Sequence, residues 1–263
     1  MIERRITFIL PKDGFVSWKV NRLKTLGSMF RSVILLVNHT RDARANAEQT
    51  LQVMALGGRE HDLCQLHIEG TDAELACMVM TDFIADQFTL VNTAHKSNVK
   101  TNIELIKQLP TFDLPFELNF TFKYLSHPNT KNDVLAHASR MLSPDSVVKM
   151  FDALYQRETT SSTAIGHGIA LPHVMNDNVD TPSMVVIQLA EEIDWQSKMG
   201  NVQFVIALAL PKPPERNMIM AFTHLTKSLL HQEYCQVLTS SREPEAVKAI
   251  LIHRLAQAFP SNS

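Results

Sequence analysis

Residues 162–173 have the sequence Ser162-Thr-Ala-Ile-Gly-His-Gly-Ile-Ala-Leu-Pro-His173, and the rest of the chain is organised around this stretch. Two glycines flank His167, and Pro172 fixes the backbone just before His173, so a stiff segment carries the last imidazole. A neutral imidazole is a nucleophile near pH 7 and can accept a phosphoryl group on nitrogen. The sequence predicts this role for His173, against the alternative of an ordinary loop or helix-end histidine.

Strand and helix patterns alternate on both sides of this stretch. Such alternation predicts a sheet with helices on both of its faces. The predicted strands are Phe120–Phe122, Ser183–Leu189 and Phe204–Leu210, and the predicted helices are Lys131–Leu142, Val147–Glu158, Met218–Leu230 and Pro244–Leu255.

The first part of the chain also alternates, which predicts a second α/β unit, an open-faced sandwich. Its expected strands are Ile6–Leu10, Val33–Val37 and Leu63–Ile68, and its expected helices are Ser17–Ser32, Ala43–Leu56 and Ala73–Phe88, the last with Leu75, Val79, Phe83 and Ile84 inward. Residues 91–115 are expected to be a linker, with a helical turn from Ile103.

Composition narrows the possible functions. Hydrophobic residues make up 45% of the 263, and 25 basic against 27 acidic residues give a net charge of -2. Direct DNA binding, which needs clustered basic residues, is therefore disfavoured, and no apolar run reaches the ~20 residues that span a bilayer. Three widely spaced cysteines and no metal-ligand spacing of histidines predict a cytoplasmic protein without a metal or cofactor site.

The longer run Arg157-Glu-Thr-Thr-Ser-Ser-Thr-Ala-Ile-Gly-His-Gly-Ile-Ala-Leu-Pro-His173 resembles a known signature. It is similar to that of the mannitol/fructose-type enzyme IIA domains of the bacterial phosphoenolpyruvate sugar phosphotransferase system, which include nitrogen-regulatory IIA proteins. In that family the last histidine carries the phosphate and the arginine lies beside it. The resemblance extends over about residues 118 to 255, and it implies catalytic roles for His173 and Arg157. Arg157 has the alternative role of capping the carbonyls at its helix end.

The run Ala55-Leu-Gly-Gly-Arg-Glu-His-Asp-Leu-Cys-Gln-Leu-His-Ile-Glu-Gly-Thr-Asp-Ala-Glu-Leu-Ala76 resembles the histidine-containing phosphocarrier protein, HPr. This similarity covers about residues 1 to 90 and implies one more short strand between Asn38 and Ala45. The family's active loop, Gly-Leu-His-x-Arg-Pro-Ala, corresponds to Gly14-Phe-Val-Ser-Trp-Lys-Val20. Val16 replaces the phosphorylated histidine, so the domain is expected to have lost its site.

Three further expectations concern the surroundings of these two sites. Trp18 beside Phe15 would be an anchor for a partner protein, unless both are core residues. The enzyme IIA family has a second histidine near the active one, and the count along the chain places Met218 there, with His224 six positions on. Backbone N–H groups around Gly166 and Gly168 are expected to add donors for phosphate.

The sequence thus predicts an HPr-like domain without its phosphorylation site (1–90), a linker (91–115) and an enzyme IIA-like domain (116–263). The expected function is regulatory and acts through protein partners, including those that control gene expression, with optional phosphorylation at His173. The alternative is an active phosphocarrier that passes phosphate from HPr through His173 to a sugar permease. No nucleic-acid contact or membrane insertion is expected.

Overall fold

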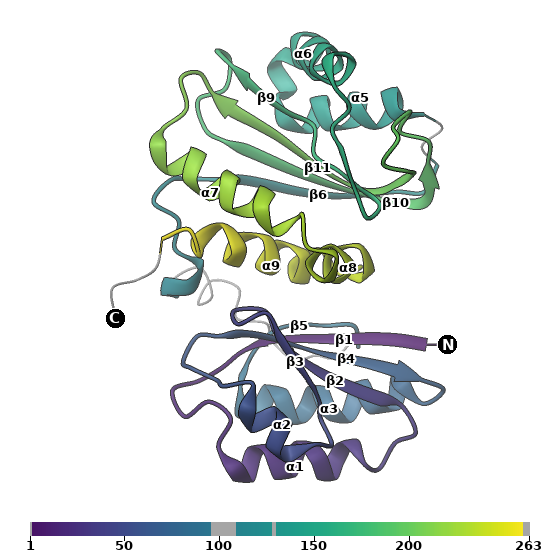
Figure 1. The fold of residues 1–263 in the computed structure, drawn as a ribbon, viewed down its shortest axis with the longest axis vertical. Helices are drawn as coiled ribbons and strands as arrows, with labels where there is room; N and C mark the ends of the chain where they lie inside the picture. Colours follow the sequence, from purple (N-terminus) through teal and green to yellow (C-terminus); the bar gives the residue numbers. More distant parts are fainter. Residues whose placement is uncertain (1, 96–108, 128–129, 260–263) are drawn as a thin grey trace. The chain divides into compact units, whose positions relative to one another are not determined.

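The computed structural model describes residues 2–95, 109–127 and 130–259 (Figure 1). The chain divides into two compact units. Met1–Asp113 and Glu243–Ser263 form the first, and Leu114–Arg242 form the second. Each unit has its own sheet and its own hydrophobic core.

The first unit is built on a five-stranded antiparallel sheet in the order β3-β2-β4-β1-β5. Along β1, Ile6 and Phe8 point to the core beneath the helices, whereas Arg5 and Thr7 point to the other face, as the two-residue period of a strand requires. The strands are β1 (Ile2–Ile9), β2 (Val33–Asn38), β3 (Ala43–Asn46), β4 (Leu63–Gly70) and β5 (Thr89–Thr93), and the helices on the core face are α1 (Ser17–Gly27), α2 (Thr50–Ala55) and α3 (Ala73–Gln87).

Helix α9 (Pro244–Ala256) belongs to this first unit although it lies near the end of the chain. Arg254 donates to the Asp42 carboxylate through Nη1 and Nη2. The His253 ring lies between the Thr40 hydroxyl and the carbonyl of Thr111, the middle residue of the short 3-10 helix η1 (Pro110–Phe112). The helix therefore packs on the face of the sheet opposite α1, α2 and α3 (Figure 1).

The predictions for the first unit need four corrections. The helix expected over Ser17–Ser32 ends at Gly27, five residues early. Ala43–Leu56 is not one helix: Ala43–Asn46 is strand β3, which pairs with β2, and only Thr50–Ala55 is helical. The HPr resemblance gave this strand correctly. The alanines suggested a helix, and that prediction was wrong because strand pairing overrides weak local propensity. Leu75 is exposed rather than inward, and β5 runs into the predicted linker. The turn predicted from Ile103 lies outside the described residues.

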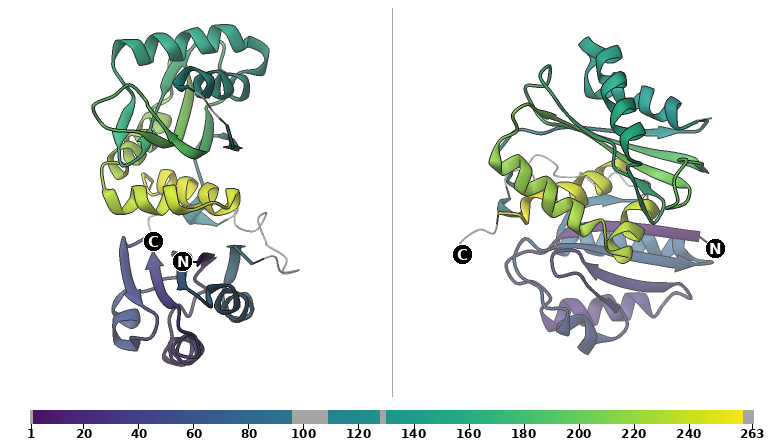
Figure 2. Two further views of the ribbon diagram at one scale, coloured as in Figure 1. Left: turned by 90° about the vertical axis from the view of Figure 1, so that its right-hand side faces the viewer. Right: turned by 45° about the horizontal axis from the view of Figure 1, so that its top comes forward.

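The second unit contains a mixed six-stranded sheet in the order β6-β10-β11-β8-β7, with β9 also paired to β11. Helices α5 and α6 cover one face and α7 and α8 the other (Figures 1 and 2), as predicted for an enzyme IIA-like domain. Its elements are β6 (Asn119–Leu125), α5 (Lys131–Leu142), η2 (Pro144–Ser146), α6 (Val147–Thr160), β7 (Ala164–Gly166), β8 (Ile169–Ala170), β9 (His173–Asn176), β10 (Ser183–Ile193), β11 (Val202–Pro211), α7 (Arg216–Ser228) and α8 (Gln232–Ser240).

The two compact units have different boundaries from the predicted domains. The predicted second domain included α9, whereas α9 contributes its contacts to the first unit. The sequence boundaries 1–90, 91–115 and 116–263 stay a prediction about how the chain is assembled from modules. In the described parts of the chain, no helix is long and apolar enough to cross a membrane.

Candidate functional site

The hairpin β7–β8 opens the stretch that the sequence singled out. Gly166 pairs with Ile169, so only His167 and Gly168 form the turn, and both have positive φ, +54° and +75°. A two-residue turn with both central residues left-handed is a type I′ turn, which suits the twist of a hairpin and favours glycine. His167 is exposed at the tip of this turn.

Strand β11 fixes the distance between that turn and His173. In the parallel pairing Ile169 lies opposite Phe204, and His173 lies opposite Leu208. The register is continuous, so five residues of extended chain, about 16 Å, separate Gly168 from His173. The expectation that N–H groups around Gly166 and Gly168 serve phosphate on His173 is therefore wrong, because they lie too far along the sheet.

His173 opens strand β9 with its side chain exposed to solvent. Its Nδ1 lies 2.8 Å from the Leu171 carbonyl oxygen. A carbonyl can only accept, so Nδ1 carries a proton and donates it. In the neutral ring Nε2 then holds the free lone pair, and it is the nitrogen available for attack on an electrophile.

Arg157 lies in the last turn of α6, the helix that packs against β9. Its Nη1 donates to the Ser161 carbonyl at 2.8 Å, so it has the helix-end contact that was the alternative to a phosphate role. Four guanidinium N–H groups remain besides the one used here. The antiparallel pairing of Ala164 with Ala170 continues in the bond from Leu171 N to Thr163 O. Thr163 lies two residues after Ser161 in the chain, and Leu171 lies two residues before His173.

Glu158 is a buried carboxylate next to Arg157 that the sequence reasoning did not single out. It follows Arg157 but points into the protein, with a side chain 1% exposed. One of its oxygens, Oε2, accepts from both the backbone N–H and the hydroxyl of Thr163, and Oε1 lies 3.7 Å from Lys131 Nζ. A glutamate in a helical pattern is normally solvated, so only its burial reveals this contact.

The two candidates for a second histidine lie on α7. Met218 is buried, and His224 is partly buried with its main-chain carbonyl accepting from Ser228 Oγ. Six residues along a helix correspond to a rotation of about 240°, so the two side chains leave the helix in different directions. The assignment of Met218 to the position of the second histidine stays a prediction.

The loop that corresponds to the HPr active loop contains no histidine from Asp13 to Val20. Val16 is the N-cap residue of α1, and the buried Lys19 donates to Asp13 Oδ1 at 2.9 Å and to the Gln87 carbonyl at 3.2 Å. Trp18 is 56% exposed. Phe15 instead packs on the core against Phe88, so the two aromatic residues have different roles.

These folds and sites define a phosphotransferase-system protein in which an HPr-like unit precedes an enzyme IIA-like unit. The chain belongs to the family described as phosphoenolpyruvate-dependent sugar phosphotransferase system, EIIA 2, whose model matches residues 118–254. The model described as the PTS HPr component phosphorylation site matches residues 19–86, a range that begins after Val16.

Several known proteins are similar to parts of the chain. A multiphosphoryl transfer protein of Shigella flexneri is 31% identical over 98 residues, 37% of this chain but only 12% of that protein. A fructose-specific EIIA component of Haloferax volcanii is 27% identical over 45% of this chain and 76% of its own length. A nitrogen regulatory protein of Bradyrhizobium diazoefficiens is 28% identical over 39% and 67%.

Solved structures also align with parts of the chain. Nitrogen regulatory protein IIA-Ntr from Neisseria meningitidis aligns with a TM-score of 0.44 at 20% identity, over 56% of this chain and 99% of that one. A histidine-containing phosphocarrier protein from Mycoplasma aligns with a TM-score of 0.30 at 20% identity, over 31% and 92%.

Proposed function

We propose that this HPr–EIIA fusion is a cytoplasmic regulatory protein that acts by binding partner proteins, and that phosphorylation of His173 modulates this binding. The partners are phosphotransferase-system components or regulatory targets, including proteins that control gene expression. The similarity to a nitrogen regulatory protein supports this choice, as does the absence of a histidine from the loop at Gly14–Val20.

The hydrogen bond from His173 Nδ1 to the Leu171 carbonyl carries the proposal. It leaves Nε2 as the nucleophile on an exposed strand end, where a donor protein can approach. In the transfer, the P–N bond of a donor phosphohistidine breaks, the donor imidazole leaves with the electron pair, and a P–Nε2 bond forms on His173. The proton stays on Nδ1 throughout, hydrogen-bonded to the Leu171 carbonyl oxygen. The phosphorylated ring therefore remains protonated and a good leaving group, which keeps the modification reversible.

Arg157 is the residue we assign to the phosphoryl oxygens. Its guanidinium is held on the carbonyl of Ser161, in the segment whose Thr163 carbonyl accepts from the Leu171 N–H just before His173. A fixed planar cation matches phosphate oxygens and stays charged at every physiological pH. Positioning and charge stabilisation are most of what phosphoryl transfer asks of a protein.

The HPr-like unit has a docking role in this proposal. Val16 has no lone pair to accept phosphate, and the ammonium group of Lys19 is already engaged by Asp13 and the Gln87 carbonyl. The exposed Trp18 lies in the same loop and helix start, where a partner can bury it. The other candidate function is that of an active carrier, which the similarity to multiphosphoryl transfer proteins favours.

A phosphorylation assay separates the two functions. The chain is mixed with labelled phosphoenolpyruvate, enzyme I and a competent HPr, and a sugar permease domain is then added as acceptor. We expect label on His173 that is passed on slowly, and no label on the HPr-like unit. His173→Gln should abolish labelling. His167→Asn, which tolerates the left-handed turn, should leave it within about twofold.

Rapid turnover of the label to the permease domain would refute the regulatory proposal in favour of the carrier. A chain that is never labelled, although enzyme I and HPr are active on a control IIA protein, would exclude His173 as a phosphorylation site. Capture of partner proteins with the wild type and with His173→Ala, each with and without the phosphorylation mixture, then tests whether the phosphate changes binding.

A further inference from the structure

Glu158 has no role in the proposed chemistry, yet its carboxylate is withdrawn from water, with Oε2 hydrogen-bonded to Thr163 and Oε1 3.7 Å from Lys131 Nζ. Its side chain is 1% exposed, and Thr163, to which it binds, is 4% exposed. Burying a carboxylate is costly unless it is paired and hydrogen-bonded, so the contact must hold something in place. It is made to the short segment that joins α6 to β7.

That segment leads directly to the nucleophile. Thr163, fixed through its N–H and hydroxyl, presents its carbonyl oxygen to the Leu171 N–H at 2.9 Å. The Leu171 carbonyl in turn accepts from His173 Nδ1 at 2.8 Å. Three consecutive contacts thus connect the buried carboxylate to the ring nitrogen whose proton selects the nucleophile.

The connection acts through position rather than through polarisation. The N–H that Thr163 donates and the carbonyl that it offers belong to different peptide groups, and the same is true of Leu171. Electronic strengthening along one hydrogen-bonded chain therefore does not apply here. A shift of the Thr163 backbone instead moves the Leu171 carbonyl away from the line of the Nδ1–H bond.

Arg157 and Glu158 hold the same segment from two sides. Successive residues leave a helix about 100° apart, so Arg157 points outward to the Ser161 carbonyl while Glu158 points inward to Thr163. Ser161 and Thr163 are thereby both fixed. The cation and the imidazole are placed relative to each other by one short piece of backbone.

We propose that Glu158 is a positioning residue for phosphoryl transfer, which acts through Thr163 and Leu171 to keep the His173 proton on Nδ1 and Nε2 free for attack. The effect of Glu158 on the rate of phosphorylation rests on the function proposed above, but its effect on the His173 tautomer does not.

The test measures the His173 tautomer in the full-length chain by ¹⁵N NMR, together with the labelling rate. Glu158→Leu removes the acceptor and should convert His173 from the Nδ1–H form to a mixture of tautomers. Labelling should become at least tenfold slower, because misplacements near 1 Å can cost that much or more. Glu158→Gln should restore both readouts to within about threefold, because both Thr163 donors converge on a single oxygen that an amide also supplies.

Two further variants keep the test decisive. Asp152→Asn removes one negative charge from the exposed side of the same helix and should change neither readout. Thr163→Val deletes one of the two donors without the loss of a buried charge, and it should shift the His173 tautomer partly. This variant keeps the test possible if Glu158→Leu does not fold. The two lesions should not add in the double variant, since they break the same contact.

A folded Glu158→Leu protein with the wild-type tautomer and labelling rate would overturn the proposal, as would a Thr163→Val protein with no tautomer shift. A wild-type chain that is never labelled would instead refute the proposed function, and the tautomer measurement would still test the role of Glu158.

Discussion

Single glycines in the two units differ in what an added methyl group would meet. Gly14 has φ +55°, and a Cβ there would lie 2.8 Å from the Gly58 carbonyl oxygen, whereas Gly168 has φ +75° and nothing within 4 Å. A left-handed alanine costs about 1–2 kcal/mol by itself. We expect that loss for Gly168→Ala and a clearly larger one for Gly14→Ala, measured by urea unfolding. Equal losses would mean that the Gly58 carbonyl moves aside.

Lys19 shows how the loop that lacks a histidine is stabilised. Its ammonium pairs with Asp13 and lies 5.1 Å from the centre of the Phe88 ring, and its stem is buried. We expect Lys19→Ala to lower the free energy of unfolding by about 1–3 kcal/mol. Lys19→Met should cost less, because the apolar stem is kept and Asp13 can turn to water. A larger loss for methionine than for alanine would contradict this account.

At the scale of residues, the prediction for His173 and Arg157 rests on their order in the chain, which resembles a family signature. Glu158 belongs to the same run, but nothing in the letters says that its side chain turns inward. The tautomer of His173 was also beyond the sequence, since it depends on the Leu171 carbonyl and hence on the path of the backbone.

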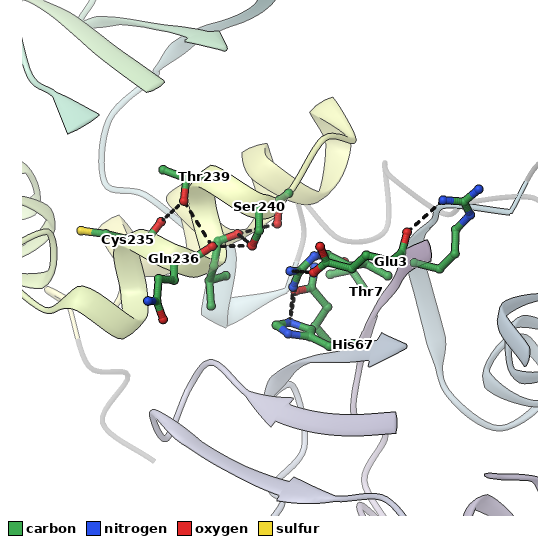
Figure 3. A network of polar contacts seen from close by, with 12 residues as sticks. Glu3, Thr7, His67, Cys235, Gln236, Thr239 and Ser240 are labelled. Atoms are coloured by element: carbon green, nitrogen blue, oxygen red, sulfur yellow. Dashed lines mark hydrogen bonds and ion pairs between the residues drawn. The ribbon is translucent and has the colours of Figure 1, made fainter. Parts of the chain in front are cut away.

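At the scale of elements, α9 and the sheet face beneath it enclose three neutral histidines. Burial lowers the pKa of His39 to about 3, of His67 to about 2 and of His253 to about 4, with nearby Arg254 and Arg5 acting in the same direction. His67 accepts from Arg5, and Figure 3 shows it with Glu3 and Thr7. In the folded protein these rings therefore stay neutral well below pH 6.5, whereas in the unfolded chain they take up protons near pH 6.5.

The stability of the first unit should accordingly fall as the pH drops from about 6.5 towards 4. The unfolded state binds more protons in this window, and each such histidine contributes up to about 1.4 kcal/mol per pH unit. Above pH 6.5 the contribution should be complete and flat. Urea midpoints between pH 8 and pH 4.5 measure the slope, and His253→Gln should make it shallower. An unchanged slope in that variant would show that His253 does not titrate as described.

Elements differ in how well the sequence foretold them. Helix α5 was predicted with its observed bounds because it has one apolar face and one polar face, and the structure adds a capping threonine, Thr130. Strand β3 was indicated by the HPr resemblance but not by the residue pattern, because four residues without β-branched side chains carry no strand signal. Helix α9 was predicted as a helix, but not its place, since its buried residues lie on nearly every side and point to no single neighbour.

At the scale of the whole molecule, the family match and the compact units divide the chain differently. The match to the EIIA 2 model continues to residue 254, whereas the contacts of the segment from Glu243 belong to the first unit. The chain has two tryptophans, Trp18 in the first unit and Trp195, fully buried, in the second. In a Trp18→Phe variant, fluorescence therefore reports on the second unit alone.

Removal of residues 243–263 tests where the free energy of α9 belongs. The deletion takes away the ion pair of Arg254 with Asp42 and the contacts of His253 with Thr40 and Thr111, so the Thr40 hydroxyl loses one partner and the first unit loses a buried helix. We expect the free energy of unfolding of the first unit, followed by circular dichroism, to fall by several kcal/mol, since buried apolar side chains each contribute roughly 1.5–3 kcal/mol.

The unfolding of the second unit, followed by Trp195 fluorescence in the Trp18→Phe background, should lose less free energy. Glu245→Ala, a change at a partly buried polar residue in the first turn of the same helix, is the control and should move neither transition. If the Trp195 transition fell further than that of the first unit, α9 would belong energetically to the enzyme IIA-like unit, as its place in the sequence suggests.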